Sequence, residues 1–354
     1  MDPALSELTE RVRAARAAHQ SLCIRAGGTK DFYGNQPRGE RLDPRSFRGI
    51  VDYEPSELVV TARCGTPLAE LEAELAARGQ MLPFEPPHFG DSATVGGCIA
   101  AGLSGPRRAS AGAVRDFVLG ATLLDGQAQV LRFGGTVMKN VAGYDVARLL
   151  AGSLGTLGLI VQASIKVLPV AAEHATMQLE ADEAEALARM NTWAGQPLPV
   201  SATAWHAGRL TVRLSGSAAA VRAARERLGG GPLEPAAAAQ LWYDIREHAA
   251  PFFQGPAPLW RLSVPSSAPP AQVAGDQLIE WGGALRWLRS SEPAATLRAA
   301  ATALGGHATL FRGGDRSAGA FTPLAPSLAD IHRRLKGQFD PDSIFNPGRM
   351  FKDL

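Results

Sequence analysis

Three glycines at a spacing of three constrain this chain more than any other part of its sequence. Gly152, Gly155 and Gly158 lie in the stretch Gly-Ser-Leu-Gly-Thr-Leu-Gly. Because glycine has no Cβ atom, the backbone there can approach a bulky ligand or adopt conformations closed to other residues. The motif indicates a cofactor loop, and a tight connection without a ligand explains so short a motif equally well.

The flanking residues argue against a nicotinamide site of the Rossmann type. In that fold the glycine loop follows a strand and opens a helix whose N-terminus faces a pyrophosphate. Here residues 145–151 are rich in alanine, leucine and arginine and favour a helix, whereas residues 159–167 form a β-branched run that favours a strand. The local order of helix, loop and strand is the reverse of the Rossmann order.

Two other segments are rich in glycine. Residues 27–29, Gly-Gly-Thr, follow a predicted short strand at 22–24, and consecutive backbone N–H groups in such a turn can converge on an anion. Between residues 91 and 105 nearly every side chain is small, as expected of a segment lying against something flat and buried. A turn without a ligand and a tight helix-packing face are the alternatives. We favour a ligand, because one bound molecule would explain all three segments.

Charge and cysteine content exclude several classes of protein. The chain has 354 residues, with 36 Lys and Arg against 34 Asp and Glu, and its net charge of +2 gives no electrostatic case for nucleic acid. Cys23, Cys64 and Cys98 lie far apart and form no Cys-x-x-Cys pair, so the sequence encodes neither a disulfide framework nor an iron–sulfur or zinc site. Any iron–sulfur centre in its electron path is therefore expected on another chain.

The sequence predicts no membrane anchor. Residues 4–19 have the pattern of an amphipathic helix that carries acids as well as bases, unlike a signal peptide. No segment reaches the roughly 18 apolar residues that a spanning helix needs. We expect a cytoplasmic protein, with any attachment to the inner membrane made through a partner subunit.

Hydrophobic periodicity predicts an α+β chain. In the first part we expect strands at 50–53 and 58–62, a helix with Thr66 as its N-cap, and a hairpin formed by residues 114–124 and 129–133. The elements of this part predict a domain over residues 1–170.

A second pattern begins after residue 170. The order of strand, helix, hairpin and helix over residues 176–228 is typical of a ferredoxin-like layer. Residues 229–232 and 251–271 are predicted as loops, residues 306–312 as a strand and residues 326–338 as a helix. We expect a cap domain at 171–325, followed by a C-terminal helix and tail at 326–354.

Five stretches, taken in chain order, resemble the vanillyl-alcohol-oxidase/PCMH-type superfamily of FAD-binding flavoproteins, and within it the D-2-hydroxyacid dehydrogenase branch. The wording Met-Lys-Asn-Val-Ala-Gly-Tyr-Asp and Ala-Gly-Ser-Leu-Gly is most similar to that of the FAD-binding E subunits of bacterial glycolate oxidases. The five stretches are residues 25–29, 93–97, 114–117, 139–145 with 152–158, and 345–349.

The resemblance implies a PCMH-type FAD-binding domain of two α+β subdomains, followed by a ferredoxin-like cap domain. It implies non-covalent FAD, because the place where some relatives carry a flavin-linked histidine has the sequence Gly-Gly-Thr-Lys here. The cofactor-binding residues that it implies are Arg25, Gly27, Gly28, Thr29, Lys30, Thr94, Gly96, Gly97, Gly102, Gly105, Asp116, Tyr144, Gly155, Gly158, Ile160 and Asn346.

The resemblance is weaker at the catalytic positions. Catalytic relatives resemble one another in a histidine-rich His-x-Gly-Asp-Gly-Asn-x-His element of the cap, whereas residues 306–312 keep one histidine, so we expect no metal. Leu154 stands where catalytic subunits usually have Glu. Oxidation of a hydroxyacid needs a base for the hydroxyl proton and a cation for the carboxylate. His307 with Arg312 or Arg349 are the candidates, and a structural role for His307 is the alternative.

These features lead to one main hypothesis and two alternatives. The chain is predicted to be the FAD-binding subunit of a glycolate (D-2-hydroxyacid) dehydrogenase complex that oxidises glycolate to glyoxylate. Its partners would be a catalytic flavoprotein subunit and an iron–sulfur subunit that receives electrons through the flavin. The alternatives are a stand-alone FAD-dependent D-2-hydroxyacid dehydrogenase and a non-catalytic flavin-carrying assembly subunit.

Overall fold

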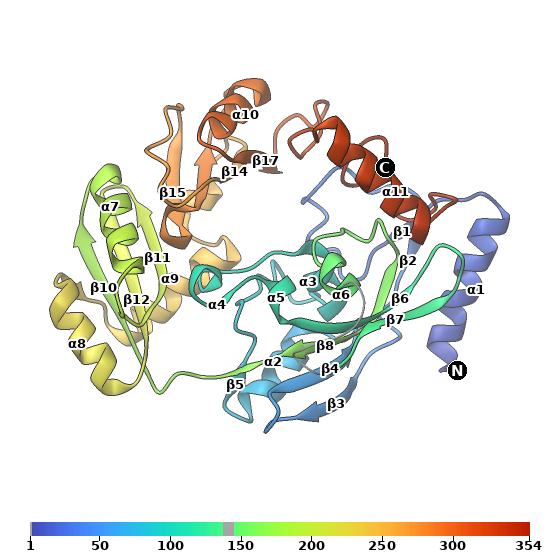
Figure 1. Cartoon of the computed structure of the whole chain (residues 1–354), viewed down its shortest axis with the longest axis horizontal. Helices are drawn as coiled ribbons and strands as arrows, with labels where there is room; N and C mark the ends of the chain where they lie inside the picture. The colour runs from blue at the N-terminus through green and yellow to red at the C-terminus, as the bar shows by residue number, and fades with distance from the viewer. Residues whose placement is uncertain (1, 137–144) are drawn as a thin grey trace.

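Two large sheets, both antiparallel, organise the fold (Figure 1). The computed structural model describes residues 2–136 and 145–354. Within these residues a five-stranded sheet is built from the first half of the chain, and an eight-stranded sheet from residues 173–312. The last helix, α11 (Pro326–Phe339), returns to the side of the first sheet, near α1 and β1.

The five-stranded sheet has the order β3-β4-β8-β6-β7, with β8 (Leu159–Lys166) in the middle. Successive residues of β8 enter opposite cores, since Ile160 packs under α2 and α3 while Leu159 and Val161 pack with α1. The other elements of this part are α1 (Pro3–Ala17), β3 (Ile50–Glu54), β4 (Val59–Arg63), α2 (Leu68–Ala76), α3 (Val95–Ala101), β6 (Val118–Leu124) and β7 (Val130–Gly134).

A small parallel pair extends this part of the fold. β1 (Leu22–Ile24) pairs with β2 (Glu40–Leu42). Phe345, in the segment near the C-terminus, forms a parallel bridge with Leu22 on β1. The amide of Leu22 donates to the carbonyl of Ile344 at 2.7 Å. The short remaining elements before residue 170 are β5 (Gln80–Met81), α4 (Arg108–Ala111), α5 (Val114–Phe117), α6 (Val146–Leu149) and β9 (Leu168–Pro169).

The first half of the eight-stranded sheet confirms the predicted ferredoxin-like layer. Its strands have the spatial order β13-β10-β12-β11, which is the order 4-1-3-2 of a ferredoxin-like unit, and two helices connect them. The elements are β10 (Glu173–Glu180), α7 (Glu183–Ala194), β11 (Val200–His206), β12 (Arg209–Gly216), α8 (Ala218–Leu228) and β13 (Gly231–Pro232).

The second half repeats that strand order, which the sequence did not predict. β15, β16, β14 and β17 have the order 2-3-1-4, and β15 pairs antiparallel with β11 to join the halves. Residues 229–232 and 251–271, predicted as loops, contain β13 and β14, because pairing with distant strands stabilises short segments of weak intrinsic preference. The elements are α9 (Pro235–Glu247), β14 (Leu259–Ser263), β15 (Asp276–Glu280), β16 (Leu285–Arg289), α10 (Ala294–Ala303) and β17 (His307–Arg312), with 3-10 turns at Pro251–Gln254 and Trp281–Gly283.

Two local predictions are wrong. Thr66 does not cap α2, because its hydroxyl donates to the carbonyl of Arg63 at 2.6 Å and accepts from the amide of Gly49 at 2.8 Å. Residues 114–117 form the helical turn α5 instead of the start of a strand. The carboxylate of Asp116 accepts from the amide of Ala113 at 2.8 Å and closes that turn.

A buried ion pair connects α11 with the glycine loop and the C-terminal segment. The ammonium of Lys336 lies 2.6 Å from the carboxylate of Asp340, and also donates to the carbonyl of Thr156 at 2.7 Å and of Phe345 at 2.8 Å. Asp340 in turn accepts from the amides of Ile344 and Phe345. Both charges are therefore fully hydrogen-bonded where water is excluded.

We expect Lys336→Met to lower the free energy of unfolding by about 3–5 kcal/mol, because it leaves the Asp340 carboxylate buried and unpaired. Chemical denaturation of the purified chain measures this change. The control is Arg333→Met on the same helix. The exposed ion pair of Arg333 with Asp330 is expected to contribute about 0.5 kcal/mol or less to the free energy of unfolding. Equal stabilities of the two variants would contradict the central role of the buried pair.

Candidate functional site

A cleft lies between the turn that follows β1 and the start of α3. The C-terminal segment and Leu154 of the glycine loop close it. Seven of the sixteen predicted cofactor residues line this cleft through the turn and α3, and an eighth lines it from the C-terminus. These eight are Arg25, Gly27, Gly28, Thr29, Lys30, Thr94, Gly97 and Asn346.

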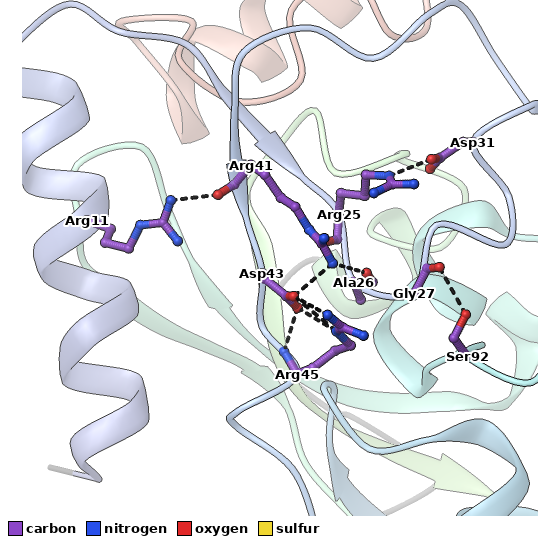
Figure 2. A network of polar contacts seen from close by, with 9 residues as sticks. All are labelled: Arg11, Arg25, Ala26, Gly27, Asp31, Arg41, Asp43, Arg45 and Ser92. Carbon is purple, nitrogen blue, oxygen red and sulfur yellow. Dashed lines mark hydrogen bonds and ion pairs between the residues drawn. The ribbon is translucent and has the colours of Figure 1, made fainter.

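The side chains of Arg41 and Ser92 donate to carbonyl groups along the start of the Gly-Gly turn (Figure 2). Arg41, on β2, donates to the carbonyls of Arg25 at 3.1 Å and Ala26 at 2.7 Å, and the hydroxyl of Ser92 donates to the carbonyl of Gly27 at 3.0 Å. In a trans peptide the N–H points away from the preceding carbonyl. The amides that follow these three carbonyls therefore point away from Arg41 and Ser92.

These amide groups fit the phosphates of a dinucleotide. Within residues 2–136 and 145–354, none of the N–H groups of residues 26–30 donates a hydrogen bond to the protein. A run of free backbone donors in a glycine turn is an anion-binding nest. Such donors would compensate the pyrophosphate of FAD without burying several cations.

Two cationic side chains of the turn, Arg25 and Lys30, line the same cleft. The ammonium of Lys30 donates to the carbonyl of His88 at 3.1 Å, and burial lowers the pKa of this amine. Arg25 forms an ion pair with Asp31, so Lys30 is the cation of the turn that lacks a carboxylate partner among the described residues. A bound phosphate would stabilise the charged form of Lys30 and offset its loss of water.

A second groove continues from the cleft. The two share Ser92 and Thr94, and the second groove is lined by Arg11, Arg45 and Arg48. Arg45 pairs with Asp43 (Figure 2), and although burial raises the pKa of that carboxyl, hydrogen bonds from Arg45 hold it below its usual value.

Several predicted glycines pack against protein instead of lining the cleft. A Cβ atom on Gly96 would lie 2.7 Å from that of Cys64, and one on Gly105 would lie 2.3 Å from the carbonyl of Glu85. Gly102 ends α3 in the left-handed conformation and contacts Gly152. Here the small residues of the 91–105 segment serve tight packing, the alternative that the sequence left open.

The glycine loop at residues 152–158 also packs against protein. Gly155 has a φ of 72°, and a Cβ atom there would meet the side chain of Asn346 at 2.7 Å. A Cβ atom on Gly158 would meet the carbonyl of Leu124 at 2.7 Å, and Ile160 is buried in the core beneath the sheet. From this loop Leu154 reaches the cleft.

Of the two remaining predicted cofactor residues, one lies away from the cleft and the other lies outside the described residues. Asp116 caps α5 at its own turn and does not line the cleft. Tyr144 lies outside the described residues, as do residues 139–143 of the motif that carried the resemblance. Asp145 caps α6 by accepting from the amide of Arg148.

Asn346 and Arg349 reach the cleft from the C-terminus and hold the backbone around it. The side chain of Asn346 accepts from the amide of Ile24 at 2.7 Å and donates to the carbonyl of Leu154 at 2.6 Å. Arg349 donates to the carbonyls of Lys30 and Asp31, and burial lowers the pKa of its guanidinium to about 10. Both residues fix the shape of the turn that presents the free amides.

The structure does not bring His307 and Arg312 together. They occupy the two ends of β17, about 17 Å apart at the usual rise of a strand. His307 is exposed, whereas the guanidinium of Arg312 lies 4.1 Å from the centre of the Phe32 ring. Neither lines the cleft that contains Arg349.

Sequence reasoning missed Arg41 and Ser92, which orient the turn. Arg41 lies on a strand of three residues, and Ser92 lies among the small residues that were interpreted only as a flat surface. Arg41 and Ser92 reach the turn only because segments distant in the sequence lie together, so no local sequence pattern could identify them. Among the described residues, no group of three or more His, Cys, Asp or Glu side chains is placed to hold a metal, and no helix is long and apolar enough to cross a membrane.

Comparison with known proteins decides the family. A family model described as "FAD binding domain" matches residues 5–134. The protein "Glycolate oxidase subunit GlcE" of Escherichia coli (strain K12) is 48% identical over 347 residues, which cover 98% of this chain and 97% of that protein. This chain belongs to the GlcE family. The predicted cofactor, FAD, is confirmed for this family member by the match to the FAD-binding domain.

Other relatives share part of the chain with this GlcE family member. "Glycolate oxidase subunit GlcD" of Bacillus subtilis (strain 168) is 31% identical over 44% of this chain and 31% of its own length. A "D-lactate dehydrogenase" of Archaeoglobus fulgidus is 32% identical over 46% of this chain and 37% of its own length. The chain thus spans about a third of these proteins.

A solved structure agrees with the predicted fold class. Alkyldihydroxyacetonephosphate synthase superposes with a TM-score of 0.67 at 15% identity, covering 97% of this chain and 74% of that protein. At this identity the likeness concerns the fold alone. It confirms, together with the family model, the α+β fold with a PCMH-type FAD-binding domain.

We expect Gly27→Ala to reduce FAD affinity by about tenfold or more, which corresponds to about 1.4 kcal/mol of binding free energy for each factor of ten. A Cβ atom on Gly27 would lie 1.7 Å from the carbonyl oxygen of Ser92, so the turn must shift. Titration of FAD into the deflavinated chain measures the affinity. Gly337→Ala is the control, because nothing lies within 4 Å of the added Cβ, and equal affinities in the two variants would contradict the role of the turn.

Proposed function

We propose that this chain is the FAD-binding subunit of a glycolate oxidase complex that converts glycolate to glyoxylate. The observation that carries the proposal is the 48% identity to GlcE over nearly the full length of both proteins. The proposed partners are a catalytic flavoprotein subunit and an iron–sulfur subunit. The proposed location is the cytoplasm, with any contact with the inner membrane made through a partner.

The proposal assigns the cleft to FAD, held without a covalent bond. Bound FAD would supply an acceptor for a hydride and for single electrons. The free amides of residues 26–30 would bind its phosphates, and Lys30 would balance part of their charge. Asn346 and Arg349 would keep the turn in place through the backbone groups that they bind. Thr29 and Lys30 stand at the turn without a histidine beside them, which supports non-covalent binding.

The buried cysteines support an iron–sulfur centre on a partner. Cys23, Cys64 and Cys98 are free and buried, and burial raises the pKa of the Cys64 and Cys98 thiols, to about 12 for Cys98. Iron–sulfur clusters are held by thiolates, usually four of them. Three inert thiols in the core do not supply such a set, so electrons would leave this subunit for a cluster on another chain.

Co-expression with the two proposed partner subunits tests the function. We expect the purified complex to reduce a dye acceptor with glycolate, and to lose this activity when the chain is omitted or carries Gly27→Ala. Flavin released intact by acid precipitation would support non-covalent binding. Full glycolate oxidation by the other subunits without this chain would overturn the proposal.

A second candidate, a flavin-carrying subunit whose flavin is not the one reduced by substrate, is favoured by the separation of His307 from Arg312. Rapid anaerobic mixing of the complex with glycolate distinguishes the two. If one flavin per complex bleaches and the Gly27→Ala complex bleaches to the same extent, the second candidate replaces the first.

We expect His307→Ala to leave glycolate turnover of the complex unchanged. His307 is exposed at the opposite end of β17 from Arg312, so these two residues cannot hold one small substrate between them. Steady-state kcat and KM for glycolate measure the effect. A large fall in kcat with unchanged flavin content would restore His307 as a base.

A further inference from the structure

A cavity of about 610 Å³ lies where β10 and β12 of the second sheet meet α9 and β5 (Figure 1). Residues 232–235 and one side chain of α8 complete its walls. Its volume is within the range of about 300–1,000 Å³ that is usual for small-molecule sites. None of the residues that line it lines the FAD cleft, so the two are separate sites.

Three charged side chains form one side of this cavity. The carboxylate of Glu85 lies 2.8 Å from the guanidinium of Arg213 and 3.3 Å from that of Arg107, and the three side chains are between 12% and 16% exposed. Glu173 and Glu234, the other carboxylates that line the cavity, are exposed, and water screens their charge. Two guanidinium groups share one carboxylate, so this side has an excess of one positive charge.

Arg107 has two donor atoms without an acceptor in the protein. Its backbone amide donates to Glu85 at 3.0 Å and its Nε at 3.3 Å, whereas within residues 2–136 and 145–354 its Nη1 and Nη2 donate no hydrogen bond. Neither nitrogen is among the buried polar atoms that lack a partner, so both are accessible. A guanidinium with accessible terminal nitrogens is well suited to bind an anion through two parallel hydrogen bonds.

His174, which also lines the cavity, responds to the same positive charge. Burial is the main reason that the pKa of its imidazole lies below the usual value, and Arg107 and Arg213 lower it further, while Glu85 and Glu173 oppose the fall. The two arginines therefore outweigh the nearby carboxylates at this position.

Trp242 gives the cavity a flat apolar wall beside the charged side. The residue is 5% exposed, and its indole nitrogen donates to the hydroxyl of Thr176 at 3.0 Å, which fixes the orientation of the ring. The guanidinium of Arg213 lies 5.1 Å from the ring centre. Ala238 and Ala239 of α9 also line the cavity, and their small side chains leave room for a planar group against the indole.

We propose that this cavity binds an organic anion with an aromatic body, with Arg107 pairing with the anionic group and Trp242 packing against the rings. Such a ligand would balance the excess charge of Arg107, Glu85 and Arg213 and would cover apolar surface at the same time. The assignment rests on the residues of the cavity and does not depend on the proposed function.

Fluorescence titration of the intact, FAD-containing chain with two dyes tests the proposal. Anilinonaphthalenesulfonate is an aromatic anion, and phenylnaphthylamine has the same rings without the sulfonate. We expect Arg107→Gln to weaken binding of the anion by about tenfold or more and to leave binding of the neutral dye unchanged. Arg108→Gln is the control, because Arg108 stacks on Trp281, at 4.4 Å, and does not line the cavity.

Filling the cavity tests the same site without altering its charges. Ala239 is exposed on α9 and lines the cavity, so Ala239→Trp is expected to prevent binding of both dyes at this site. Ala236→Trp is the control, because Ala236 is exposed on the same helix and does not line the cavity. Unfolding curves and flavin content show whether each variant is folded and retains FAD.

Three results would each overturn the proposal. They are absence of anion binding to the unaltered chain, equal affinity of Arg107→Gln and Arg108→Gln for the anion, and equal dye binding by Ala239→Trp and Ala236→Trp. If Arg107→Gln does not fold, the comparison of the two tryptophan variants decides whether the cavity is the binding site.

Discussion

The buried pair of Lys336 and Asp340 holds together the three segments on which the FAD cleft depends. Two charges without water are stable only when every donor and acceptor around them is satisfied. Lys336 reaches this state through the carbonyls of Thr156 and Phe345, so α11, the glycine loop and the C-terminal segment have one arrangement that satisfies it. The shape of the cleft follows from that arrangement, although neither residue touches the cleft.

From this pair the C-terminal segment extends to the Gly-Gly turn. Asn346 joins the amide of Ile24 to the carbonyl of Leu154, and Arg349 binds the carbonyls of Lys30 and Asp31. On the opposite side Arg41 binds the carbonyls of the same turn. With its carbonyl groups engaged by the protein, the turn leaves its amides free for an anion.

The second sheet packs against the segment that follows α3. Its two halves join between β11 and β15, and that join places Glu280 opposite the segment that leaves the FAD cleft. Trp281 donates to the carbonyl of Gly105 at 3.0 Å and fixes the two parts against each other.

The sequence alone indicated the Gly-Gly turn and most elements before residue 228, because periodicity, turn residues and a free glycine backbone act over a few neighbouring residues. The FAD-binding family was indicated by the resemblance of short motifs. The sequence could not separate Gly27, which lines the cleft, from Gly96 and Gly158, which touch only protein, since close approach to a ligand and close approach to a backbone require the same residue. The repeated half of the second sheet and the distance between His307 and Arg312 were decided by the tertiary structure. Each depends on strand pairing between residues far apart in the chain, which no local pattern encodes.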